Sequence, residues 1–157
     1  METDKEMRVD LFTEGIKNAL ICENDEKNLG LITNALESLD YKVMVATSAQ
    51  DVEEKLQFVH YDIIILNEAF GGETGKDNAI LRYLNTIPMT IRRDMLVVFV
   101  GKDFRTLDHM AAFANSVNVV VNIDHLKDIQ SILKTSITHH EKFYKVFKDY
   151  LKEAGRA

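Results

Sequence analysis

The sequence has few of the residues that cross-link a chain or interrupt its helices and strands. Its 157 residues include one cysteine, one proline and no tryptophan. The single cysteine, Cys22, excludes a disulfide framework and any zinc site built from cysteines. The chain has no apolar run of about 18 residues, so no segment is predicted to span a membrane. The first residues lack the basic and apolar parts of a signal peptide, and we therefore expect a cytoplasmic protein.

What is present fits one globular domain with a full hydrophobic core. The chain is 46% hydrophobic and 28% charged, and its formal net charge is −6. That charge is unevenly distributed, because the first 125 residues carry −9 and the part from Leu126 onward carries +3. The acidic average argues against nucleic-acid binding over the whole surface.

Five short apolar runs predict five buried parallel strands. They are Ala19–Cys22, Val43–Ala46, Ile63–Leu66, Met95–Val100 and Val117–Val121. Apolar residues at three- and four-residue steps between the runs predict helices, and strand–helix alternation indicates a parallel sheet covered on both faces. We therefore expect an α/β fold of the flavodoxin-like, doubly wound type, with strand order 2-1-3-4-5. Functional residues of such a sheet lie at the carboxyl ends of its strands.

The strand ends carry a resemblance to a known family. The segment 20–26, LICENDE, is similar to the first strand and acidic turn of response-regulator receiver domains. The segment 61–67, YDIIILN, resembles their third strand, and Gly75 stands where receivers commonly have a glycine. The resemblance covers residues 18–137. It implies a receiver-like domain between an N-terminal extension, residues 1–17, and a C-terminal helical extension, residues 138–157.

The resemblance also places the phosphorylation chemistry of receivers on this chain. In that family two acidic residues hold Mg²⁺, an aspartate accepts the phosphoryl group, and a hydroxyl and a lysine stabilise it. The matching positions here are Glu23, Asn24, Asn67, Gly101 and Asn122. Only one carboxylate remains, and an amide cannot form an acyl phosphate. Asn67 and Asn122 are expected to cap helices or stabilise turns. The alternative is a small-ligand pocket between Glu23 and these two asparagines.

These substitutions predict a degenerate, non-phosphorylatable receiver, or pseudo-receiver, that acts through protein–protein interaction in a two-component-type pathway. We expect no enzymatic activity, no cofactor and no metal site. One alternative is a response regulator that is phosphorylated at an unorthodox acidic residue, Asp25 or Glu68. A second alternative is a flavodoxin-like protein that binds a small ligand.

The C-terminal part of the chain predicts a long amphipathic helix. An apolar stripe extends from Leu126 to Leu151, about 15 residues beyond the usual end of a receiver. The interaction surface is predicted on its last turns, at Phe143, Tyr144, Phe147, Tyr150 and Leu151. Three partners remain open: the N-terminal segment (Met7, Val9, Leu11, Phe12 and Ile16), a second copy that forms a homodimer, or another signalling protein. Neither nucleic acid nor a membrane is expected as a partner.

Overall fold

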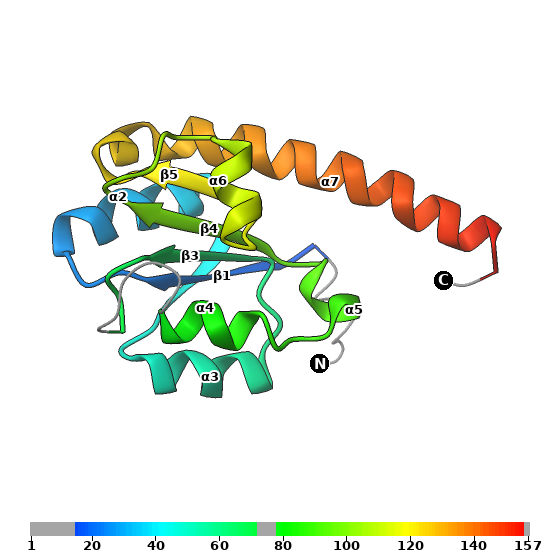
Figure 1. The fold of residues 1–157 in the computed structure, drawn as a ribbon, viewed down its shortest axis with the longest axis horizontal. Helices are drawn as coiled ribbons and strands as arrows, with labels where there is room; N and C mark the ends of the chain where they lie inside the picture. The colour runs from blue at the N-terminus through cyan, green and yellow to red at the C-terminus, as the bar shows by residue number, and fades with distance from the viewer. Residues whose placement is uncertain (1–14, 72–77, 156–157) are drawn as a thin grey trace, which may run out of the picture.

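The computed structural model describes residues 15–71 and 78–155, and within them five parallel strands form one sheet. The strands are β1 (Lys17–Cys22), β2 (Tyr41–Val45), β3 (Ile63–Asn67), β4 (Leu96–Gly101) and β5 (Val119–Asn122). Their order in the sheet is β2-β1-β3-β4-β5. The flavodoxin-like, doubly wound architecture predicted from the apolar runs is therefore confirmed (Figure 1).

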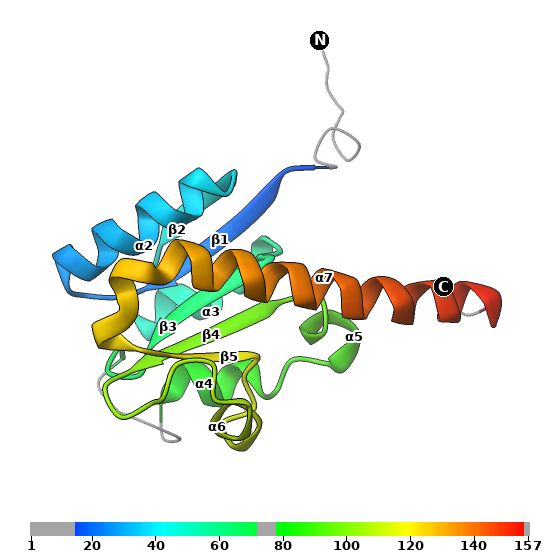
Figure 2. The ribbon, with the colours of Figure 1, turned by 90° about the horizontal axis from the view of Figure 1, so that it is seen from above.

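Helices cover both faces of the sheet. The helical segments are α2 (Glu26–Ser38), α3 (Ala49–Phe58), α4 (Ala79–Leu84), α5 (Met89–Arg92), α6 (His109–Ala114), the 3₁₀ segment η3 (Ile123–Asp128) and α7 (Ile129–Glu153). Helices α2 and α7 pack on one face, while α3, α4 and α6 pack on the other. Viewed from above, α7 crosses the sheet and continues well past its edge (Figure 2).

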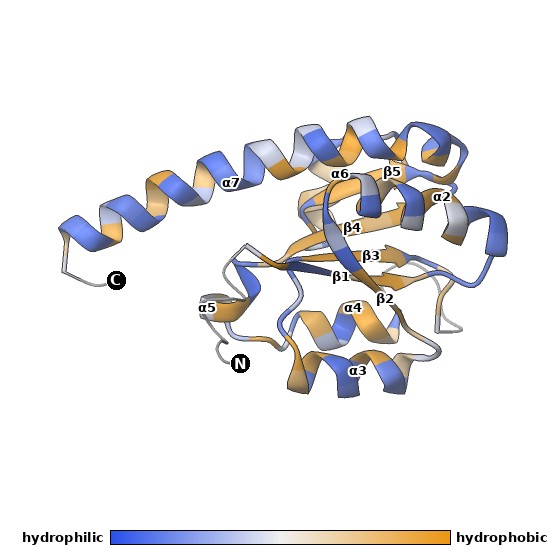
Figure 3. Ribbon diagram, turned by 180° about the vertical axis from the view of Figure 1, so that it is seen from behind, coloured by the Kyte–Doolittle hydropathy of each residue, from blue (hydrophilic) through white to orange (hydrophobic). Residues whose placement is uncertain are grey.

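The core consists of two apolar clusters that the sheet separates. Consecutive residues of β3 alternate between them, so that Ile64 belongs to the cluster beneath α3 and α4 and Ile65 to the cluster beneath α2 and α7. Both side chains are fully buried. The central strands β3 and β4 are accordingly coloured as hydrophobic over most of their length (Figure 3). Burial on both faces explains why these strands appear in the sequence as unbroken apolar runs.

Local side chains fix where several helices begin. Asp25, Ser48 and Asp108 each accept a hydrogen bond from a backbone N–H in the first turn of the following helix. Asn78 does the same for α4, and its amide nitrogen also donates to the carbonyl oxygens of Glu68 and Phe70. The start of α4 is thereby tied directly to the segment that follows β3.

The structure departs from the sequence prediction at three places. β2 is an edge strand, and Met44 and Val45 are partly exposed, so burial of this run on both faces was wrong. The segment before the fourth apolar run, for which no helix was predicted, contains the short helix α5. The C-terminal apolar stripe begins in the 3₁₀ segment η3, and the α-helix proper starts only at Ile129.

Helix α7 extends without a break across the boundary at residues 137 and 138. Among the described residues no helix is both long and apolar enough to cross a membrane. Of the N-terminal residues expected to pack on α7, Met7, Val9, Leu11 and Phe12 lie outside the described residues, as does Gly75. Ile16 is described and its side chain is exposed.

Candidate functional site

The carboxyl ends of the strands meet at one edge of the sheet, and the strand register determines which residues are neighbours there. Glu23 follows β1, and Asn67 ends β3 beside it, because the residues that precede them are paired between these strands. Gly101 and Asn122 are paired at the ends of β4 and β5. The positions that match the receiver site therefore lie along a single edge, as the parallel topology requires.

Glu23 and Asn67 form a closed hydrogen-bonded pair. The Asn67 side-chain amide donates to Glu23 Oε1 at 2.8 Å, and both residues are buried, with 5% and 9% of their surface exposed. Glu23 Oε2 accepts from the backbone N–H of Asp25 at 3.0 Å, and Asn67 Oδ1 accepts from the N–H of Ala69 at 2.9 Å. Both carboxylate oxygens and both polar atoms of the amide thus have protein partners, as buried polar groups require.

The residues after Glu23 serve the start of α2. Asn24 and Asp25 are exposed, and Asp25 Oδ1 accepts a hydrogen bond from the Asn28 N–H at 3.1 Å. This interaction caps the helix. It engages the carboxylate of Asp25, the next acidic residue along the chain after Glu23. Across the described parts of the chain, no three histidine, cysteine, aspartate or glutamate side chains are grouped so that they could hold a metal ion.

Glu68 fills the space beside Gly101. A Cβ atom at position 101 would lie 2.6 Å from Glu68 Oε2 and 2.8 Å from a ring carbon of Phe104. Glu68 Oε2 also accepts from the backbone N–H of Lys102 at 3.1 Å, which holds the side chain in place. The position where a receiver has its hydroxyl is therefore occupied by a neighbouring carboxylate and an aromatic ring.

The Asn122 side chain bonds to the loop after β4 and to the start of η3. Its amide nitrogen donates to the carbonyl oxygens of Phe104 at 2.7 Å and Lys102 at 3.3 Å, and its Oδ1 accepts from the Asp124 N–H at 2.8 Å. Asn122 thus braces the loop after β4 and caps η3. This is the cap role expected for it, and the structure does not bring it together with Glu23 and Asn67 in one pocket.

The edge as a whole offers little reactive chemistry. The position of the phosphoryl acceptor carries an amide, and the position of the lysine carries an amide that is bonded to backbone. Cys22, at the end of β1, is fully buried, and burial raises the pKa of its thiol far above the usual range. A thiol in this state is a packing group and a poor nucleophile.

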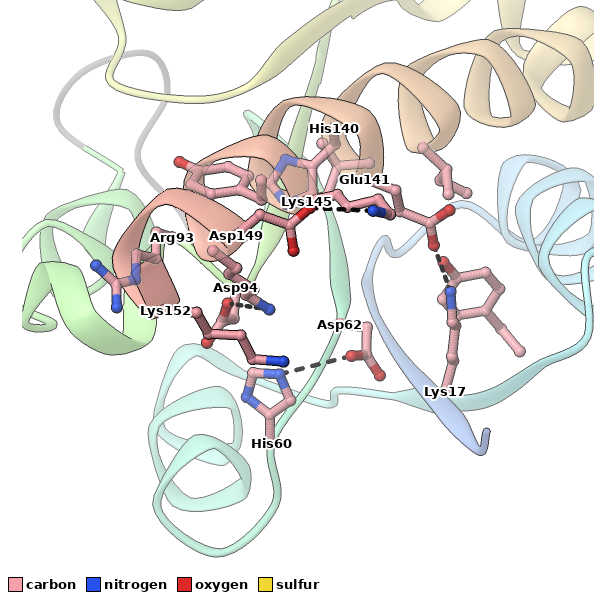
Figure 4. Close-up of a pocket in the computed structure, with 15 residues that line it drawn as sticks. Lys17, His60, Asp62, Arg93, Asp94, His140, Glu141, Lys145, Asp149 and Lys152 are labelled. Carbon is pink, nitrogen blue, oxygen red and sulfur yellow. Dashed lines mark hydrogen bonds and ion pairs between the residues drawn. The ribbon is translucent and has the colours of Figure 1, made fainter. Parts of the chain in front are cut away.

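A groove of about 610 Å³ lies at the opposite edge of the sheet, beneath α7 (Figure 4). Charged side chains of the body and of α7 meet across it. The pairs that join them are Lys17 with Glu141 and Lys148 with Asp94, the second at 3.3 Å. Arg93 adds a cation–π contact, with its guanidinium carbon 5.1 Å from the ring centre of Phe147. These contacts hold α7 to the starts of β1 and β4.

Two histidines in this groove have pKa values shifted in opposite directions. The Asp62 carboxylate, with Oδ1 3.6 Å from His60 Nε2, raises the pKa of His60. Burial lowers the pKa of His140, and the nearby positive charge of Arg92 adds to that effect. The groove therefore contains one histidine that favours its protonated form and one that favours its neutral form.

The structure divides the five residues predicted as an interaction surface between two sides of α7. Tyr144 and Phe147 face the body of the domain, since Tyr144 lines the groove beneath the helix and Phe147 lies under Arg93. Leu151 is partly buried. Phe143 and Tyr150 are exposed on another side. The predicted surface is therefore not one continuous face.

Sequence reasoning missed two residues at these sites. Val146 lies in line with Phe143 and Tyr150 on the exposed side of α7, where the spacing of 143, 146 and 150 could have revealed it. Glu68 was considered only as an alternative phosphoryl acceptor. Its position over Gly101 depends on the tertiary packing of β3 against β4 and leaves no signal in the sequence.

Comparison with known proteins supports the fold and leaves the chemistry open. No protein-family model and no curated protein matches the chain. Among solved structures, a CheY-like receiver domain protein from Methanospirillum hungatei is similar at 16% identity and a TM-score of 0.61, covering 81% of this chain and 98% of that one. The receiver domain of a putative Luxo repressor protein from Vibrio parahaemolyticus is similar at 16% identity and a TM-score of 0.60, covering 85% and 95%. The Mn²⁺-bound response regulator Rcp1 is similar at 18% identity and a TM-score of 0.58, covering 74% and 91%. The chain therefore has the fold of response-regulator receiver domains.

Proposed function

We propose that this chain is a pseudo-receiver, a non-catalytic signalling domain in a two-component-type pathway that acts by binding a protein partner and is not phosphorylated. The observation that carries the proposal is the hydrogen bond of 2.8 Å between Asn67 and Glu23. At the acceptor position this amide is committed to a buried carboxylate and has no nucleophilic oxygen.

Two further features support the same conclusion. The space for a hydroxyl beside Gly101 is filled by Glu68 and Phe104. Asn122 supplies no positive charge, so a transferring phosphoryl group would lack both alignment and charge neutralisation. Restoring one group alone would leave the other two absent.

Intact-mass measurement of the full chain after incubation with acetyl phosphate and Mg²⁺ tests the proposal. We expect an unchanged mass, while a conventional receiver domain treated in parallel gains one phosphoryl group. A gain of one phosphoryl group on this chain would overturn the proposal. The variants Asp25→Asn and Glu68→Gln would then show whether either carboxylate is the unorthodox acceptor.

A small-ligand function would also be visible in simple measurements. We expect no shift in the melting temperature with flavin or nucleotides, because the buried Glu23 and Asn67 side chains are already satisfied by protein partners. A saturable shift with any of these compounds would support the flavodoxin-like alternative.

A further inference from the structure

The outer side of α7 carries an apolar seam that the described residues leave uncovered. Phe143, Val146 and Tyr150 are 66%, 70% and 68% exposed. Val146 follows Phe143 by three residues and Tyr150 follows Val146 by four, so the three side chains form a line along the helix. His139 continues this line toward the sheet at the same spacing. We call these four residues the outer seam.

The outer seam leads into a second groove, between α7 and α6, with a volume of about 530 Å³. His139 and Phe143 form one wall of this groove, and Leu107 and Ala112 contribute to the other. On α6, Met110 and Phe113 are largely exposed as well. Exposed apolar side chains therefore occur on both helices that border this groove, which is more than single scattered surface residues would provide.

We propose that the outer seam binds the outer seam of a second copy of this chain, with the two α7 helices antiparallel. This inference deepens the proposed function by naming the protein partner. A twofold arrangement requires a self-complementary patch. If one residue contacts a second residue of the other copy, that second residue must also contact the first residue of the other copy. The charges that flank the outer seam meet this requirement.

Lys142 and Asp149 flank the outer seam on the same side of the helix, two turns apart. If Phe143 lies against Val146 of the second copy, Lys142 approaches Asp149 of that copy, and the twofold axis creates the same ion pair again. A parallel pairing would place Lys142 and Asp149 opposite Phe147 and Ala154, which are uncharged. The charge pattern therefore favours the antiparallel arrangement.

The existing partner of Asp149 does not prevent this pairing. Asp149 is bonded to Lys145 on its own helix at 3.1 Å, and both side chains are largely exposed. Exposed pairs of this kind contribute little to stability, so Asp149 can share its carboxylate with a second lysine.

The same register gives Tyr150 a place to bind. It lies against His139 of the second copy, at the mouth of the groove between that copy's α6 and α7. The two helices then overlap over their distal halves, and the two domain bodies lie at opposite ends. The contact is smaller than a standard interface of about 800 Å² per partner, so we expect weak, concentration-dependent association.

Sedimentation equilibrium of the full chain, from about 5 to about 500 µM, measures this association. We expect a monomer–dimer equilibrium, and we expect Phe143→Ser to raise the dimer dissociation constant at least roughly tenfold. Phe58→Ser is the matched control, because Phe58, at the end of α3, is a phenylalanine that is exposed even more than Phe143. It should leave association unchanged.

Charge reversal tests the ion pairs separately from the apolar contact. Lys142→Glu and Asp149→Lys each create two like-charge contacts in the dimer, and each should weaken association roughly tenfold. The double variant restores opposite charges and should return the dissociation constant to within about threefold of the original. The double variant has the net charge of the natural chain, so a general charge effect cannot explain the rescue.

Cysteine crosslinking distinguishes the two helix orientations. In the antiparallel pair, residues 139 and 150 face each other, while two copies of residue 150 are about 16 Å apart along the helix axis. Mixed His139→Cys and Tyr150→Cys chains should form a heterodisulfide, and Tyr150→Cys alone should form none. The native Cys22 is buried and does not interfere.

Several results would overturn the inference. They are a monomer at every concentration, a dimer insensitive to Phe143→Ser, and a disulfide between two Tyr150→Cys chains. None of these outcomes depends on phosphorylation, so the mass measurement described above fails or succeeds independently.

Discussion

A buried carboxylate requires hydrogen-bond donors, and Asn67 is one of the two donors that Glu23 has at the carboxyl edge of the sheet. A carboxylate at position 67 would be a second negative charge at hydrogen-bond distance. Two carboxylates this close do not both ionise readily, and one pKa is raised. At the scale of single residues, Asn67 therefore stabilises a charge that an aspartate would repel.

Asn67→Asp should lower the free energy of unfolding by about 1–3 kcal/mol at pH 7. A carboxyl group whose pKa is raised by folding destabilises the protein as pH increases above its unfolded value. The loss should therefore be smaller at about pH 5 than at pH 7. Urea unfolding at the two pH values measures the difference.

The double variant Glu23→Gln/Asn67→Asp is the matched control. It exchanges donor and acceptor, so that the glutamine amide can donate to the new carboxylate and its oxygen can still accept from Asp25. We expect most of the lost stability to return. If the double variant were less stable than Asn67→Asp, the hydrogen bond would not be the cause.

At the scale of elements, α7 is joined to the body by charged contacts as well as by its apolar face. Leu133 packs in the core beneath the helix, and farther along, Glu141 and Lys148 form ion pairs with Lys17 and Asp94. His140 lies between these pairs, in the groove where His60 also lies. Stability near neutral pH should therefore depend on both histidines, with opposite signs.

The pKa of His60 is raised in the folded protein, so its contribution is complete below about pH 6.5 and is lost as pH rises through the higher folded value. The pKa of His140 is lowered, so the unfolded chain binds its proton first and stability falls as pH drops below about 6.5. Between about pH 8 and 5.5, His140→Gln should reduce the acid loss of stability and His60→Gln should increase it.

Urea unfolding across this range provides the measurement. The charged groups that face His140 are Arg92, Asp94, Glu141 and Lys148, and these remain in both variants. These neighbouring groups are thus common to all the curves. If both substitutions changed the pH dependence in the same direction, the opposite environments assigned to the two histidines would be wrong.

The sequence was sufficient to predict elements whose residues are buried on both faces. The run Ile63–Leu66 became β3, and the three- and four-residue spacing after Ile129 became α7. It was insufficient where a tertiary neighbour decides the outcome. The helical spacing places both Phe143 and Tyr144 on the predicted apolar stripe. Only the position of the domain body shows which of the two faces it. The same holds for Glu68 over Gly101.

At the scale of the whole molecule, the sheet contributes strand residues to both apolar clusters, one on each of its faces. Residues Ile64 and Ile65 are adjacent in β3, both fully buried, and belong to different clusters. They therefore provide a matched pair of probes for the two sides of the domain.

Ile64→Ala and Ile65→Ala should each lower the free energy of unfolding by about 2–5 kcal/mol. Because the sheet is shared, each variant should still unfold in one transition with an unchanged dependence on urea concentration. Far-UV circular dichroism and tyrosine fluorescence followed on the same samples measure this. Separate transitions for the two signals would show that the two layers unfold independently.

The unbroken length of α7 has a mechanical consequence. Its 25 residues form a rod about 37 Å long, which packs in the core at Leu133 and is tied to the starts of β1 and β4 through Glu141 and Lys148. A rotation of about 5° about Leu133 would displace Lys148, about 22 Å farther along the axis, by about 2 Å. The helix is thus a lever arm, and a small rotation where it packs on the sheet becomes a larger displacement at the ion pair of Lys148 with Asp94.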